Sequence, residues 1–144
     1  MRLRGGELLA LIGAASVIVS IFLRNYENAG GELTGLDTFG PALALMLIAA
    51  AAGLVLAAAT VTERSSALPV AAAVWTAVLG LVAVIAALVR VLERPQHATM
   101  VCAGAWLALG GAVAIFAGAW LSIHDERTSL YDAASPEKRP PPAP

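Results

Sequence analysis

Side chains that could carry chemistry are few in this sequence, and their spacing decides which reactions remain open. The two histidines, His97 and His124, lie before and after the last apolar run. A helix through that run would hold them roughly 35–40 Å apart at about 1.5 Å per residue, so one chain could not place both on one metal ion. Asp125 and Glu126 follow His124, but consecutive residues of a helix point in different directions. We therefore predict no metal site and no cofactor.

Nucleophilic catalysis has one candidate, Cys102, which lies five residues after His97. A Cys/His nucleophile would need a helix start that lets the two side chains touch, and a donor for the developing oxyanion. Nothing in the sequence supplies that donor. We interpret Cys102 as a buried, inert thiol, and a lone cysteine cannot form an intramolecular disulfide. The sequence thus predicts no catalytic residues and a protein that is not an enzyme.

The longest polar interruption before the C-terminal tail is FLRNYENAGGELTGLDTFGPA, residues 22–42. Its carboxylates are Glu27, Glu32 and Asp37. They could bind a divalent cation, but the spacing of a calcium-binding loop is absent. We interpret the segment as a flexible polar strap between two buried helices, and the cation site remains the alternative. The apolar residues expected to return to the membrane interface are Leu33, Leu36 and Phe39.

The composition indicates whether the chain is suited to water or to a lipid bilayer. Of its 144 residues, 59% are hydrophobic and 13% are charged. Soluble domains are typically about 45–50% apolar and about 25% charged, so this chain has too little polar surface to cover itself in water. Its net charge of −1 provides no basic patch for nucleic acid. We predict an integral membrane protein surrounded by the lipid bilayer, with no nucleic-acid partner.

Four apolar runs are long enough to cross a bilayer core of roughly 30 Å, which needs about 20 residues per helix. The predicted helices cover residues 5–23, 39–62, 68–92 and 98–123. Pro41 and Pro69 each lie in a first turn, where a missing N–H removes no helical hydrogen bond. Short connections should make the last three helices antiparallel neighbours.

The predicted fold class is therefore all-α. It is a four-transmembrane-helix antiparallel bundle with short loops, formed by residues 1–127. Residues 128–144 are proline-rich, and we predict a disordered cytoplasmic tail there.

Basic residues near the spans predict the orientation in a cell membrane. If both termini lie on one side, that side carries Arg2, Arg4, Arg64, Arg127, Lys138 and Arg139. The other side carries only Arg24, Arg90 and Arg94. Cytoplasmic segments carry the excess of Lys and Arg, so we expect a multi-pass protein with both termini in the cytoplasm. The first run resembles a signal peptide but is long for one and lacks a cleavage site, so we expect its helix to be retained.

Small residues recur every fourth position in two predicted helices. The helix-packing candidates are Ala49, Gly53 and Ala57 in one helix, and Gly110, Ala114 and Gly118 in the other. Such stripes let two backbones approach closely in lipid. Ala112 faces roughly opposite Ala114, and we expect it to contribute less to packing. Ser16 and Ser20 are expected to bond to carbonyls of their own helix rather than to another helix.

The centres of the four runs contain no Asp, Glu, Lys, Arg or His. Ionisable residues at membrane depth usually mark proton relays and ion paths, so their absence disfavours coupled transport. Trp75 and Trp106 have two interpretations: they plug the bundle, or they face acyl chains.

Several stretches together resemble a family of small, uncharacterised four-helix membrane proteins of actinobacterial type. The matching segments are RGGELLALIGAA, VSIFLRNY, LTGLDTFG, RSSALPVA, LGLVAVIAALVRVLERP and GAWLALGGAVAIFAGAWLSIHDER. Family members more often end the first helix with a Pro-Trp-Tyr-like segment, of which only Tyr26 is present here. The resemblance implies the four-helix fold and its topology, and it implies no activity.

These observations favour a small non-enzymatic integral membrane protein. We expect a structural or interaction component that assembles through helix faces, as a homo-oligomer or with an unidentified membrane protein partner. The alternative is a passive channel or small-molecule transporter formed by oligomers.

Overall fold

A computed structural model of the protein describes residues 5–62, 67–94 and 98–133. The chain is mostly helical. Its long helices are α1 (Gly5–Phe22), α3 (Pro41–Thr62), α4 (Ala67–Glu93) and α5 (Ala103–Ala133). Each contains a segment long and apolar enough to span a membrane, which confirms four candidate spans and supports a multi-pass membrane protein. α3 begins at Pro41, two residues after the predicted start, and Pro41 lies in its first turn as predicted.

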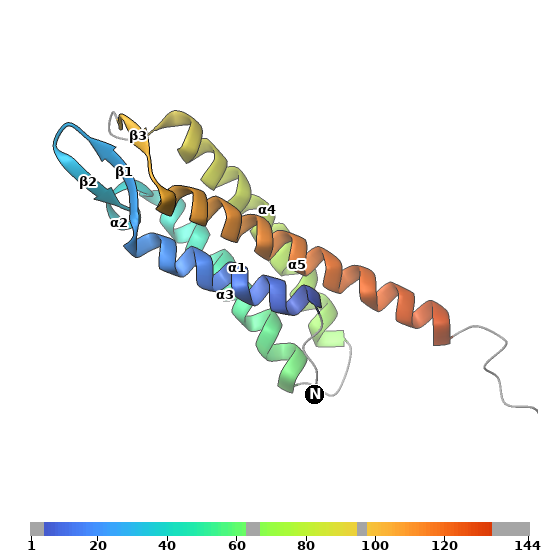
Figure 1. Ribbon diagram of the computed structural model, residues 1–144. Helices are drawn as coiled ribbons and strands as arrows, with labels where there is room; N and C mark the ends of the chain where they lie inside the picture. Colours follow the sequence, from blue (N-terminus) through green and yellow to red (C-terminus); the bar gives the residue numbers. More distant parts are fainter. Residues whose placement is uncertain (1–4, 63–66, 95–97, 134–144) are drawn as a thin grey trace, which may run out of the picture.

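The long helices lie side by side in a closed ring (Figure 1). α1 packs against α3 and α5, and α4 packs against the same two helices. Consecutive long helices run in opposite directions (Figure 1). The first and the last long helix are therefore direct neighbours, and their contact closes the ring.

Small side chains fill most of the space between the helices. The alanines with no exposed surface are Ala10, Ala14, Ala49, Ala83, Ala108, Ala112 and Ala119. Larger buried side chains such as Met46, Leu56 and Ile115 occupy the wider gaps. Trp75 and Trp106 are 67% and 57% exposed, so they face outward, toward acyl chains in a membrane, and do not plug the bundle.

Three short strands and a one-turn helix cover one end of the ring (Figure 1). They are β1 (Arg24–Asn28), β2 (Gly31–Thr34), α2 (Gly35–Thr38) and β3 (Met100–Val101). The sheet order is β2-β1-β3, and both pairs are antiparallel. We call residues 24–38 and 98–102 the cap.

The cap corrects two predictions. The segment expected to be a flexible strap is a β-hairpin followed by a helical turn, and the fold is therefore not purely all-α. The hairpin turn has physical causes: the Asn28 side chain accepts a hydrogen bond from the Gly30 N–H at 2.8 Å, and Gly31 has a φ of 131°, which glycine adopts without strain. Of the three residues expected at the interface, Phe39 is buried, Leu33 is half-buried and Leu36 is exposed.

The last long helix differs most from its predicted bounds of 98–123. It begins at Ala103 because the preceding residues form β3 and its connection to the helix. It continues to Ala133, so part of the segment predicted as a disordered tail is helical. The remaining tail residues, 134–144, lie outside the described part of the chain.

Candidate functional site

The contact between α1 and α5 is made by glycine backbones. A Cβ added at Gly6 would lie 2.6 Å from the Gly118 carbonyl oxygen, and one added at Gly13 would lie 2.6 Å from the Gly111 oxygen. One added at Gly111 would lie 2.8 Å from the Gly13 oxygen. Real Cβ atoms do not approach other atoms this closely, so any side chain at these positions would push the helices apart.

The spacing along both helices explains this contact. The buried glycines of α5 lie seven residues apart, at Gly104, Gly111 and Gly118, and those of α1 at Gly6 and Gly13. Seven residues are close to two helical turns, so these positions share one face of each helix. The predicted stripe assumed a spacing of four, and the seven-residue repeat was the signal that would have located the contact.

Of the predicted packing residues of α5, some lie in a helix contact and one does not. Gly118 lies in the α1–α5 contact, and the Ala114 side chain lies beside Gly13. Gly110 is exposed, and an added Cβ would meet nothing within 4 Å, so it touches no other helix of this chain. Ala112, expected to face away, has no exposed surface and packs with Ala49 and Ala83. The packing face is therefore rotated relative to the predicted stripe.

The packing candidates on α3 are all buried, but they contact several different helices rather than one. Ala49 packs in the cluster that joins α3, α4 and α5. A Cβ at Gly53 would lie 3.3 Å from the Ala10 carbonyl oxygen of α1. Ala57 is 7% exposed. This stripe therefore faces the centre of the ring.

Hydroxyl groups on the helices bond to backbone carbonyls. Ser16 donates to the Ile12 oxygen at 2.9 Å, and Ser20 donates to the Val17 oxygen at 2.6 Å, which confirms that both bond within α1. Thr76 of α4 instead reaches across to the Ala52 oxygen of α3 at 3.1 Å.

Asn25 fastens the cap to the end of α1. Its side chain is fully buried. In the amide orientation that satisfies its surroundings, the nitrogen donates to the carbonyl oxygens of Ser20 at 2.8 Å and Leu23 at 3.0 Å. These carbonyls lie at the C-terminus of the helix, where intrahelical donors run out. The side chain fits there because two neighbouring residues, Gly35 and Gly104, have no Cβ.

Tyr26 fastens the cap to the end of α4. It is fully buried, and its hydroxyl donates to the Arg90 carbonyl oxygen at 2.9 Å. Burial raises the pKa of this phenol, so it stays protonated and keeps donating. The Arg90 side chain in turn donates from Nη2 to the Phe39 carbonyl oxygen at 2.9 Å, just before α3. One chain of hydrogen bonds thus joins β1, α4 and the start of α3.

Two of the cap carboxylates, Glu32 and Asp37, have structural partners. Glu32 pairs with Arg24 across the hairpin, and this raises the pKa of the guanidinium. Asp37 accepts hydrogen bonds from the Thr34 hydroxyl at 2.7 Å and the Thr34 N–H at 3.1 Å, which lowers the pKa of its carboxyl group. These two hydrogen bonds lie at the start of α2. Glu32 therefore holds the strand pair, and Asp37 holds the helical turn.

The cap ties together segments that are distant in the sequence. The Thr99 N–H and the Cys102 N–H donate to the Glu27 and Asn25 carbonyl oxygens, each at 2.8 Å. Cys102 is half-buried rather than fully buried. His97 lies outside the described residues. Within the described part of the chain, no group of three or more His, Cys, Asp or Glu residues is placed to hold a metal ion.

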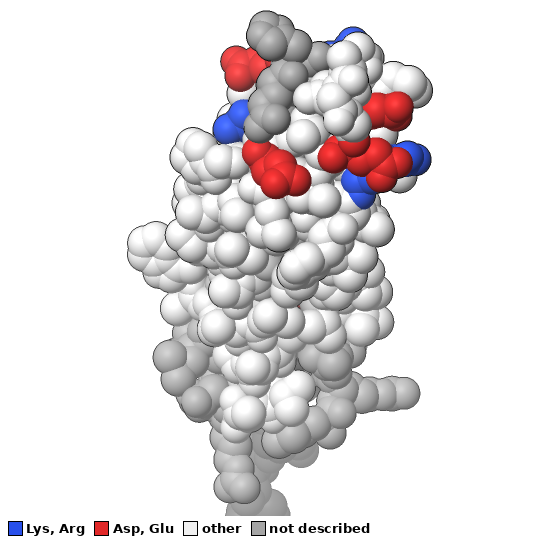
Figure 2. All heavy atoms as spheres, turned by 90° about the vertical axis from the view of Figure 1, so that its left-hand side faces the viewer, with Lys and Arg blue, Asp and Glu red and all other residues white. Residues whose placement is uncertain are grey.

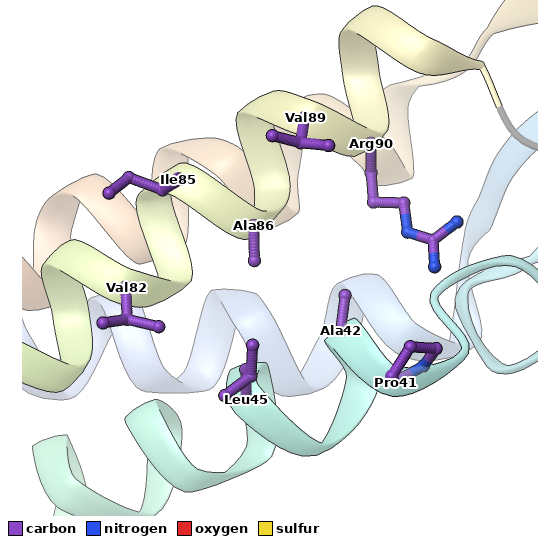
Figure 3. A pocket seen from close by; sticks show the side chains of 8 residues that line it. All are labelled: Pro41, Ala42, Leu45, Val82, Ile85, Ala86, Val89 and Arg90. Atoms are coloured by element: carbon purple, nitrogen blue, oxygen red, sulfur yellow. The ribbon is translucent and has the colours of Figure 1, made fainter.

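A groove of about 370 Å³ lies between α3 and α4 next to the cap (Figure 3). Its lining residues are Pro41, Ala42, Leu45, Val82, Ile85, Ala86, Val89 and Arg90. All are apolar except Arg90, whose guanidinium reaches toward the start of α3 (Figure 3). A second hollow of about 460 Å³ lies on the surface of α5, beside Phe116 and Trp120.

No protein-family model, curated protein or solved structure matches this chain.

Proposed function

We propose that this chain is a small non-enzymatic integral membrane protein that serves as a structural or interaction component, and that a partner recognises its cap. The observation that carries the proposal is the ordered cap itself. Two chain segments about 70 residues apart pair there, and buried Asn25 and Tyr26 fasten the sheet to the helix ends. Connecting two helices requires no such structure, whereas a rigid support for exposed side chains is typical of a recognition surface.

Charged side chains also lie at the cap end of the molecule. Figure 2 shows acidic and basic side chains gathered there, and the residues drawn in white below them carry none. The exposed charged residues at this end are Arg24, Glu32 and Asp37 on the cap, with Glu93 and Arg94 beside it. Polar groups outside the membrane can discriminate between partners through charge complementarity, and the lipid-facing body offers no comparable pattern.

The glycine contacts have a different role in this proposal from the one expected from sequence. Gly13, Gly111 and Gly118 hold α1 against α5 within the chain. They are therefore not free to bind a partner helix. An oligomer or a complex would therefore form through the cap.

The conduit alternative gains no supporting observation. A path for a polar solute needs polar groups directed into it. The buried hydroxyls of Ser20, Thr76 and Ser122 instead bond to backbone carbonyls, and alanines fill much of the ring.

A photo-crosslinking side chain placed at two matched positions tests the proposal in native membranes. Leu36 on the cap is 54% exposed, and Val55 on the lipid-facing side of α3 is 60% exposed. We expect a discrete protein adduct from position 36, whose mass tells a second copy from another protein, and no protein adduct from position 55. Adducts from position 55 alone, or none from position 36 in folded protein, would contradict the proposal.

A further inference from the structure

The groove between α3 and α4 has the depth of one membrane leaflet. Along α4 it runs from Val82 to Arg90, which is about 12 Å at roughly 1.5 Å per residue. Half of a bilayer core of roughly 30 Å is about 15 Å. Because Arg90 lies in the last turn of α4, next to the cap, the groove runs from the membrane interface toward the midplane.

The groove also has the character of a ligand site. Its volume of about 370 Å³ falls within the range of about 300–1,000 Å³ found for small-molecule sites. Its walls are the aliphatic side chains of Leu45, Val82 and Ile85, with the small Ala42 and Ala86 between them (Figure 3). An apolar, elongated ligand from the bilayer fits such walls.

Arg90 supplies a cation at the interface end of the groove. One guanidinium N–H is used by the Phe39 carbonyl oxygen. In the part of the chain that the structure describes, the ion pair found is Arg24 with Glu32, and no carboxylate lies within 4 Å of Arg90. A guanidinium has five N–H donors in a planar fork suited to phosphate. The positive charge and the remaining N–H donors of Arg90 can therefore bind an anionic oxygen atom.

The guanidinium is also held in place before any ligand arrives. Tyr26 binds the Arg90 carbonyl oxygen and fixes the end of α4, while Phe39 fixes Nη2. A Cβ added at Gly40 would lie 3.3 Å from Nη2, and Gly40 has a φ of 49°, so glycine there leaves room for the arginine. Prior ordering lowers the entropic cost of binding.

We propose that this groove binds an anionic glycerophospholipid of the cap-side leaflet, with one acyl chain between α3 and α4 and the phosphate on the Arg90 guanidinium. The acyl chain covers the apolar walls, and the phosphate neutralises a charge that no nearby described carboxylate compensates. A zwitterionic head group would bring a second positive charge next to Arg90. No described carboxylate lies close enough to Arg90 to pair with that charge. This lipid site is independent of the partner surface proposed for the cap.

Native mass spectrometry of protein released from mixed phosphatidylglycerol and phosphatidylcholine nanodiscs tests the lipid site. We expect wild-type protein to retain phosphatidylglycerol in preference to phosphatidylcholine by about fivefold, which corresponds to about 1 kcal/mol for one arginine near a membrane surface. Arg90→Gln should remove the preference. Arg24→Gln, which changes an exposed cap arginine paired with Glu32, should keep it.

Filling the groove provides a second test that leaves Arg90 unchanged. Ala86→Phe should abolish retained phosphatidylglycerol, whereas Ala51→Phe, on the exposed side of α3, should not. Melting curves establish that each variant is folded. Equal retention of both lipids by wild type, unchanged preference in Arg90→Gln, or equal effects of the two phenylalanines would overturn the proposal. The proposal would also be overturned if inorganic phosphate raised the melting temperature of the protein as much as phosphatidylglycerol does. The site would then bind a free anion.

Discussion

Two helix contacts in this molecule differ in how closely the backbones approach. Between α1 and α5, glycine lies opposite glycine, and no side chain separates Gly13 from Gly111 or Gly6 from Gly118. Between α3 and α4 at the cap end, the helices do not close on each other, and a groove of about 370 Å³ remains. Both pairs of helices are almost entirely apolar. Apolarity alone therefore does not decide whether a contact closes.

The difference follows from the solvent. In lipid, burying an apolar side chain against a neighbouring helix gains little, because acyl chains are equally apolar. Dispersion between closely packed atoms must supply the association energy, and it falls steeply with separation. Missing side chains thus close the α1–α5 contact, whereas the α3–α4 groove remains accessible to a lipid chain.

The largest expected effect comes from adding bulk inside the closed contact. Gly118→Ile should destabilise the protein by about 1–3 kcal/mol or more, because the new side chain meets backbone that must move. Ala112→Ile should also destabilise it, since Ala112 is fully buried. Gly110→Ile, on the exposed side, should change stability far less. Melting temperatures in detergent measure the stability of the three variants. Equal melting temperatures would contradict the assignment of Gly118 and Ala112 to tight contacts and of Gly110 to the exposed side.

The next largest effect concerns the cap end of the same contact. Asn25→Asp keeps the shape of the side chain but replaces the amide donor by an acceptor facing the Ser20 and Leu23 carbonyls. Leaving buried polar groups without a donor costs about 1–3 kcal/mol each, and a negative charge at a helix C-terminus adds to the loss. A lower melting temperature at neutral pH is expected. A wild-type melting temperature would show that Asn25 does not hold the end of α1.

A smaller loss of stability is expected from a change at the more open pair of helices, α3 and α4. Tyr26→Phe removes the hydrogen bond to the Arg90 carbonyl oxygen, which should cost about 0.5–1.5 kcal/mol. Equilibrium unfolding of the purified protein measures this loss. A loss greater than that of Asn25→Asp would mean that the end of α4, rather than the α1–α5 contact, limits stability.

The smallest effect is expected inside the groove. Ala86→Leu adds volume to a space that is already open, so the free energy of unfolding should stay within about 0.5 kcal/mol of the wild-type value, as at surface positions. A large destabilisation would indicate that α3 and α4 are packed as tightly as α1 and α5.

The sequence predicted the features that depend on composition and local chemistry. Long apolar runs located the four candidate spans, Pro41 lies in the first turn of α3, and Ser16 and Ser20 bond within their own helix as expected. These features are local, because each needs only residues within one or two helical turns.

The cap could not be predicted in the same way. Its strands have two to five residues and no clear alternation, and β3 pairs with a segment about 70 residues earlier. Asn25 lies in the segment predicted as a flexible polar strap, yet it is fully buried, and its burial depends on the missing side chains of Gly35 and Gly104. The predicted stripe on the last helix included Gly118 but took Gly110 in place of Gly111, because many alanines obscure the seven-residue spacing of the glycines.

The most direct test of the closed α1–α5 contact is the same small change at two adjacent residues. A Cβ at Gly111 would lie 2.8 Å from the Gly13 oxygen and 2.9 Å from Val17 Cγ2, whereas one at Gly110 meets nothing within 4 Å. Alanine favours a helix over glycine by up to about 1 kcal/mol. The melting temperature in detergent should therefore fall for Gly111→Ala and stay level or rise for Gly110→Ala. A Gly111→Ala protein at least as stable as wild type, or a Gly110→Ala protein that is the less stable of the two, would contradict the account.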